Sequence, residues 1–125
     1  MKKGFTLVEV LAVIALLSII AVIAIPSITN VLNNTQDKTY ELTIAKIKMQ
    51  AEKYLIDEAL DQTITDSNYE DVYLNVLLIN NYLSAEDLDD PRNVSQKIDA
   101  VNSYIRFSLS SGELISTENI LFESK

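Results

Sequence analysis

The sequence predicts an α+β fold, in which a long, bent N-terminal helix packs its second half against a small antiparallel β-sheet head. Three observations predict it: an apolar run long enough for a membrane helix, an amphipathic helical pattern after it, and strand-like alternation in the last third. With 125 residues, the chain is long enough for one small domain but not for two.

The composition argues against an enzyme. The chain has no Cys and no His, so disulfides and thiol chemistry are excluded. Zinc sites and the usual Ser-His-Asp or Cys-His catalytic groups are out of reach as well. We therefore expect no catalytic residues, no cofactor and no metal site.

Charge is concentrated outside the N-terminal residues. The formal net charge is −8, from 18 acidic and 10 basic residues, and residues 1–30 hold only Lys2, Lys3 and Glu9 of these. The remainder is strongly acidic and would repel phosphate backbones, which argues against direct nucleic-acid binding. It is interpreted as a solvent-facing head attached to an apolar anchor.

The apolar element extends from Phe5 to Ile25 and is interrupted only by Thr6, Glu9 and Ser18. As a helix with a rise of about 1.5 Å per residue, it would cover roughly 30 Å, the hydrocarbon thickness of a bilayer. The lysines before it place the N-terminus in the cytoplasm. A cleaved secretory signal fits poorly because its apolar core is shorter. A plain anchor and a membrane helix that packs against copies of itself remain.

A plain anchor does not explain Glu9. An acidic residue at the centre of a membrane helix costs about 2.5–3.5 kcal/mol and usually has a partner and a function. Glu9 lies only about 6 Å along the helix from Phe5, so we expect a lower cost. Snorkelling of the carboxylate to the headgroups and attraction to the helix dipole are alternatives to a specific partner.

The stretch Gly4-Phe5-Thr6-Leu7-Val8-Glu9 follows a short basic leader and precedes an apolar run that ends Ala24-Ile25-Pro26. It resembles the class III signal of type IV pilins and pseudopilins. The resemblance implies a pilin-like fold with a leader at residues 1–4, a membrane and filament-core helix at 5–30, and a soluble head at 31–125. Prepilin peptidase would cut between Gly4 and Phe5 and methylate the new Phe5 amine. Gly4, which has no side chain, suits a tight protease subsite.

The resemblance also implies an assembly role for Glu9. Its carboxylate would pair with the Phe5 amine of a neighbouring subunit, a cation that exists only after cleavage. Buried ion pairs add little net stability, but an unpaired charge in an apolar interface costs several kcal/mol, so such a pair fixes register. The implied partners are copies of the chain and other pilins in a helical filament, prepilin peptidase, an assembly platform, an ATPase, and the inner or cytoplasmic membrane.

Pro26 is predicted to affect the helix, because it cannot donate to the carbonyl of Val22 and its ring crowds the preceding turn. A bend in a continuous helix is one alternative; local unwinding in a packed filament, which the resemblance implies, is the other.

After Pro26 an amphipathic pattern predicts helix to about Leu60. Its apolar face comprises Tyr40, Ile44, Ile47, Ala51, Tyr54 and Leu55.

Short elements are predicted next. Residues 61–68 read as a loop. Ser67, three residues before Glu70, predicts a capping box that starts a helix to about Asn81. Ser84 predicts the cap of a further turn, which Pro91 ends.

The last third predicts strands. Residues 103–109 alternate between apolar and mixed positions, residues 110–113 form a natural turn, and residues 114–115 and 120–122 are candidate return strands.

An acidic run at residues 86–90 raises the question of a calcium site. Its spacing fails the EF-hand pattern, because Pro91 and Arg92 stand where a ligand and the glycine would be. We interpret it as a solvated loop.

These expectations combine into a structural subunit of a type IV pilus, processed by prepilin peptidase and polymerised through its N-terminal helix. It would be a single-pass membrane protein before assembly and part of a cell-surface filament afterwards. A pseudopilin of a secretion or DNA-uptake machine is the alternative with the same N-terminal chemistry. A single-pass anchored binding module that never polymerises is the alternative from another class.

Overall fold

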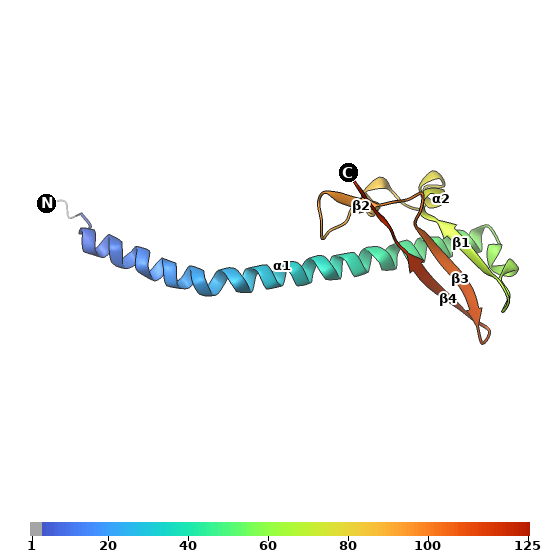
Figure 1. Cartoon of the computed structure of the whole chain (residues 1–125), viewed down its shortest axis with the longest axis horizontal. Helices are drawn as coiled ribbons and strands as arrows, with labels where there is room; N and C mark the ends of the chain where they lie inside the picture. Colours follow the sequence, from blue (N-terminus) through green and yellow to red (C-terminus); the bar gives the residue numbers. More distant parts are fainter. Residues whose placement is uncertain (1–3) are drawn as a thin grey trace. The chain divides into compact units, whose positions relative to one another are not determined.

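The computed structural model describes residues 4–125, so most of the predicted leader, including Lys2 and Lys3, lies outside the described residues. These residues form two compact units, residues 4–35 and residues 36–125. We call residues 4–35 the N-terminal segment and residues 36–125 the head unit. Helix α1 (Leu7–Asp57) runs through both, and short helices and small antiparallel sheets complete the head unit (Figure 1). The predicted α+β class is confirmed.

Helix α1 begins at Leu7 and ends at Asp57, close to the predicted bounds. It stays helical through Pro26, although the proline nitrogen has no hydrogen to give to the carbonyl of Val22. Within the described residues, the helix is therefore not opened at this position.

Apolar side chains of the N-terminal segment are exposed around the helix, with Phe5 reaching 89%. Hydroxyl groups turn back on the helix backbone. The Ser18 hydroxyl donates to the carbonyl oxygen of Ile14 at 2.8 Å, and the Thr29 hydroxyl donates to that of Pro26 at 2.9 Å. Because these polar groups are paired internally, the segment presents mainly hydrocarbon to its surroundings.

The head unit is built on the predicted apolar stripe of α1. Ile47, Ala51 and Leu55 are fully buried and Ile44 nearly so, while Tyr40 and Tyr54 pack at the margin of the core. The rest of the core comes from the sheets, the short helices and the loops: Ile64, Val72, Leu74, Leu77, Leu83, Leu88, Ile98, Ile105 and Phe107.

A three-stranded antiparallel sheet has the strand order β1-β3-β4. Its strands are β1 (Tyr69–Tyr73), β3 (Tyr104–Ser110) and β4 (Glu113–Asn119). Strands β3 and β4 are joined by the predicted turn, in which Ser111 and Gly112 have φ values of 54° and 82°. Positive φ at both central residues is typical of a type I′ hairpin.

The predicted helix that starts near Ser67 is wrong in its first half. Residues 69–73 form β1, and only Leu74–Ile79 are helical (α2). Three of the five β1 residues are Tyr or Val, which favour strand. Pairing with β3 also brings Val72 into the core opposite Ile105. The capping box expected at Ser67 therefore has no helix to cap.

The C-terminal residues form a second, two-stranded sheet. Strand β5 (Phe122–Ser124) pairs antiparallel with β2 (Gln96–Ile98), not with the β3–β4 hairpin. A return strand was predicted near this position, but its partner was not. Strand β2 is three residues long, which is too short to show an alternating pattern.

Two short 3-10 turns lie in the connecting loops, η1 (Leu60–Thr63) and η2 (Ala85–Leu88). At η2, the backbone N–H and the hydroxyl of Ser84 both donate to Oδ2 of Asp87, at 2.9 and 3.1 Å. The predicted cap at Ser84 is confirmed, and the turn ends before Pro91 as expected.

Candidate functional site

Thr6 and Glu9 form a reciprocal cap at the start of α1. The backbone N–H of Glu9 donates to Oγ1 of Thr6 at 3.2 Å, and the backbone N–H of Thr6 donates to Oε2 of Glu9 at 2.8 Å. Two N–H groups that a helix start leaves unpaired are thereby satisfied. The carboxylate also lies at the positive end of the helix dipole, which stabilises its charge.

This capping box was missed in the sequence, although its signal was present. Thr6-Leu7-Val8-Glu9 has the Ser/Thr-x-x-Glu spacing directly before an apolar run. The cap gives Glu9 a role within a single chain. It leaves room for a further partner, because only Oε2 of this carboxylate accepts a hydrogen bond from residues 4–125.

Phe5 and Glu9 lie on the same side of the helix start and, together with Val10 and Val13, line a hollow of about 210 Å³. A Cβ added to the preceding Gly4 would meet no atom within 4 Å. The folded chain therefore makes no steric demand for glycine there. Any such demand would come from a protein that binds this part of the chain.

The structure brings three of the four predicted site residues together. Gly4, Phe5 and Glu9 lie at the start of the N-terminal segment, whereas Pro26 lies inside α1, beyond this cluster. Cleavage between Gly4 and Phe5, methylation of Phe5, and the assembly roles of Glu9 and Pro26 stay predictions.

Comparison with protein families identifies this cluster as part of a known motif. The family model of the prokaryotic N-terminal methylation motif matches residues 1–25. This motif is the class III signal peptide of type IV pilins and pseudopilins. Searches of curated proteins and of solved structures gave no match. The chain thus carries the signal for pilin-like processing by prepilin peptidase and for pilin-like assembly.

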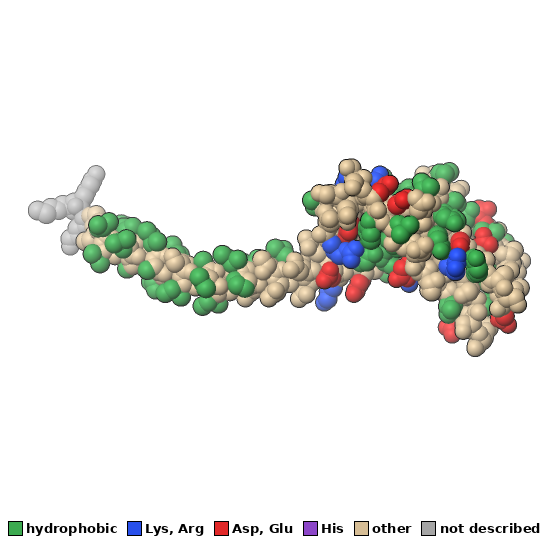
Figure 2. All heavy atoms as spheres, in the orientation of Figure 1, with side chains coloured by type: hydrophobic (Ala, Val, Ile, Leu, Met, Phe, Trp, Pro, Cys, Tyr) green, Lys and Arg blue, Asp and Glu red, His purple; other side chains and the backbone are tan. Residues whose placement is uncertain are grey.

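The N-terminal segment has the surface of a membrane helix. Near its N-terminus α1 is long and apolar enough to cross a membrane, by length and composition. Apolar side chains cover this part of the helix, and acidic and basic side chains gather over the head unit (Figure 2). The segment suits a lipid bilayer, because α1 pairs its backbone groups internally.

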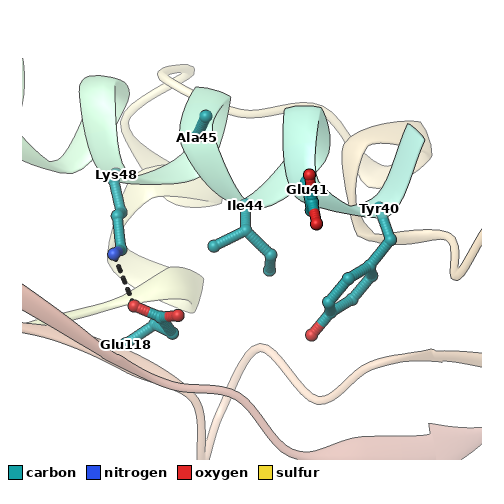
Figure 3. Close-up of a pocket in the computed structure, with 6 residues that line it drawn as sticks. All are labelled: Tyr40, Glu41, Ile44, Ala45, Lys48 and Glu118. Carbon is teal, nitrogen blue, oxygen red and sulfur yellow. Dashed lines mark ion pairs between the residues drawn. The ribbon is translucent and has the colours of Figure 1, made fainter. Parts of the chain in front are cut away.

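The head unit has a shallow depression of about 270 Å³ between α1 and β4. Figure 3 shows Lys48 reaching from α1 to Glu118 of β4, with Ile44 and Tyr40 directed toward the space below the helix. The Lys48 ammonium lies 2.5 Å from the Glu118 carboxylate and lowers the pKa of that carboxyl below its ordinary value by hydrogen bonding. The pair ties β4 to α1 across this depression.

Three carboxylates of the acidic run at residues 86–90 each have a cationic partner. The pairs are Asp87 with Lys46, Asp89 with Lys125, and Asp90 with Arg92. Across residues 4–125, no group of three or more acidic side chains is arranged to hold a metal ion. These pairs connect the run to α1, to Lys125 directly after β5, and to its own loop.

Proposed function

We propose that this protein is a structural subunit of a type IV pilus that prepilin peptidase processes and that polymerises through its N-terminal helix. The methylation motif at residues 1–25 carries the proposal. It is supported by the apolar surface of the N-terminal segment, which is stable in a bilayer or against other apolar helices but not in water. In this proposal the protein acts by assembly and catalyses no reaction.

Before assembly the proposed subunit spans the inner or cytoplasmic membrane once, with its N-terminus in the cytoplasm. The lysines before the apolar run favour this orientation. After assembly the apolar helices form the filament core and the head units face outward. Their acidic surface suits contact with water. An assembly platform and an ATPase would drive the transfer from membrane to filament.

The cap at Thr6 gives a physical account of how Glu9 could act in both states. In the single chain, one carboxylate oxygen of Glu9 accepts the N–H of Thr6. Cleavage would turn the neighbouring Phe5 nitrogen from a peptide amide into a cationic amine. The second oxygen of Glu9 would then accept a hydrogen bond from the Phe5 amine of another subunit, while the first oxygen keeps the helix capped. One such pair per subunit would select a single register among many similar packings.

The first test is mass spectrometry of the protein extracted from membranes of its native host. We expect a chain that begins at N-methylated Phe5. Intact protein that begins at Met1 would contradict the proposal and favour the anchored binding module. Replacement of Gly4 by a bulky residue should prevent the cleavage without unfolding the head unit, since Gly4 has open space around it.

The second test is the variant Glu9→Ala, with Glu52→Ala as its control, because Glu52 is an exposed acid on the same helix. We expect Glu9→Ala to be processed normally but to yield few filaments, whereas Glu52→Ala should assemble as the wild type does. Normal filament yield from Glu9→Ala would overturn the assembly role. Filaments that stay short and few in the wild type would favour the pseudopilin alternative.

A further inference from the structure

The outer face of the three-stranded sheet carries a group of aromatic side chains. Alternation along the strands places Tyr69 and Tyr73 of β1, and Tyr104 and Arg106 of β3, on the side away from the core residue Ile105. We call these three tyrosines and the arginine the tyrosine face. Tyr69 is 56% exposed and Tyr73 is 40% exposed, so the face is open to solvent.

Arg106 and Asp71 hold the rings of the tyrosine face in place. The guanidinium carbon of Arg106 lies 3.8 Å from the ring centroid of Tyr69 and 5.2 Å from that of Tyr104. Its Nε and Nη2 donate to the two carboxylate oxygens of Asp71 at 2.7 and 2.8 Å. The ring centroids of Tyr73 and Tyr104 are 5.3 Å apart. Because contacts within the face already order these side chains, the protein would lose less side-chain entropy when a ligand binds.

The charge of this face selects against ionic ligands. Asp71 neutralises Arg106, so the face has no net charge. A cationic ligand on the rings of Tyr69 and Tyr104 would lie close to the guanidinium of Arg106 and would be repelled by it. A single-stranded nucleic acid would need a positively charged groove beside the rings. Beyond residue 30, however, acidic side chains outnumber basic ones about two to one. The surface therefore favours a neutral ligand.

Neutral hydrogen-bonding groups extend the face on β4. Asn119 stands opposite Tyr104 and Thr117 stands opposite Arg106, and both are exposed. The C–H groups of a sugar ring carry partial positive charge and pack on the negative face of an aromatic ring. Its hydroxyls can exchange hydrogen bonds with the amide, the hydroxyl and the phenol groups of this surface. Flat aromatic rings beside neutral polar groups thus match the two sides of a sugar.

We propose that the tyrosine face binds a neutral polysaccharide. The face lies on one head unit and needs no second subunit, so the inference is independent of polymerisation. It can be tested on monomers, and its failure would leave the proposed pilus function untouched.

The experiment uses the full chain, isotope-labelled, in a detergent without a sugar headgroup. Cellohexaose, maltohexaose and N-acetylated chitohexaose are titrated separately, and backbone NMR shifts are followed. We expect at least one sugar to bind with a Kd below about 5 mM and to shift amides of β1 and β3. Tyr69→Ala should weaken binding about tenfold or more, whereas Tyr69→Phe, which keeps the ring, should retain most of it.

Ile79→Ala is the control, because Ile79 is 76% exposed in the head unit but lies on α2; its affinity should equal that of the wild type. If Tyr69→Ala unfolds, Tyr73→Ala makes the same comparison. Absence of binding by all three sugars would overturn the proposal. Shifts outside β1, β3 and β4, or stronger binding of oligothymidine than of any sugar, would do so too. Self-association that Tyr69→Ala abolishes would assign the face to a second copy instead.

Discussion

Ile14 and Ile47 are the same residue type on the same helix, but Ile14 is 53% exposed and Ile47 is fully buried. The N-terminal segment leaves its apolar side chains open and pairs its hydroxyls with its own backbone. The head unit buries a core of apolar side chains and pairs charges at its surface. The head unit thus carries its own hydrophobic driving force, whereas the N-terminal segment depends on a bilayer or on other helices.

The largest expected effect comes from the same kind of truncation in the two units. Phe107→Ala removes a fully buried ring and should lower the free energy of unfolding of the head unit by about 3–5 kcal/mol. Leu17→Ala removes an exposed side chain and should change it by less than about 0.5 kcal/mol. Near-UV circular dichroism during denaturation in detergent measures this, because all six tyrosines lie in the head unit. A comparable loss from both variants would break the comparison.

A second effect separates two kinds of charge pair within the head unit. Arg106→Ala leaves the carboxylate of Asp71, which is 18% exposed, without its bidentate partner and should cost about 1–3 kcal/mol. Lys97→Ala breaks a pair with Glu123 in which both side chains are 45% exposed, and should cost less than about 1 kcal/mol. Urea denaturation of the two variants provides the measurement. The reverse order would show that the Asp71 pair is as well solvated as the Glu123 pair.

A third, local effect tests the start of α1. Thr6→Ala removes the hydroxyl that accepts the N–H of Glu9 and should destabilise the first helical turn by about 1 kcal/mol. Thr6→Ser should preserve it. Hydrogen exchange of the amides of residues 7–10 in micelles should quicken only in the alanine variant, with no change in the melting of the head unit. Equal exchange in all three proteins would argue against the capping box.

The smallest expected effect is a pH dependence of the head unit. A hydrogen bond from Lys46 holds the pKa of Asp87 below its ordinary value, and Lys48 does the same for Glu118. The unfolded chain then binds protons more readily, so this stabilisation is present above the unfolded pKa of about 4 and is lost as the pH falls through the folded values. Partial exposure keeps it modest. Lys46→Met should flatten the acid limb of a plot of melting temperature against pH; an unchanged limb would contradict the assignment.

Local patterns predicted much of the fold. The apolar stripe that contains Ile47 and Leu55, the β3–β4 hairpin and the cap at Ser84 follow from signals within a few residues of each other. Strand β1 did not follow, because a local helix-start signal competed with a pairing to β3 that is decided far along the chain. The pairing of β2 with β5 has no local signal at all.

The same distinction applies to the sites. The N-terminal methylation motif is local, and so is the cap between Thr6 and Glu9, which the sequence contains but which considerations of membrane cost alone did not reveal. The tyrosine face depends on the register that places Asp71 opposite Arg106. Such a face can be recognised only after two distant strands have been paired.

The arrangement of the core also sets an order of events during synthesis. The buried stripe of α1 from Ile44 to Leu55 is synthesised first, and Ile105 and Phe107, which share its core, follow about 50 residues later. Chains grow at about 5–20 residues per second, so the stripe waits for seconds without its final cover. The N-terminal segment is available to a membrane throughout that interval. Anchoring can therefore precede folding, and the head unit then folds as the remainder of the chain arrives.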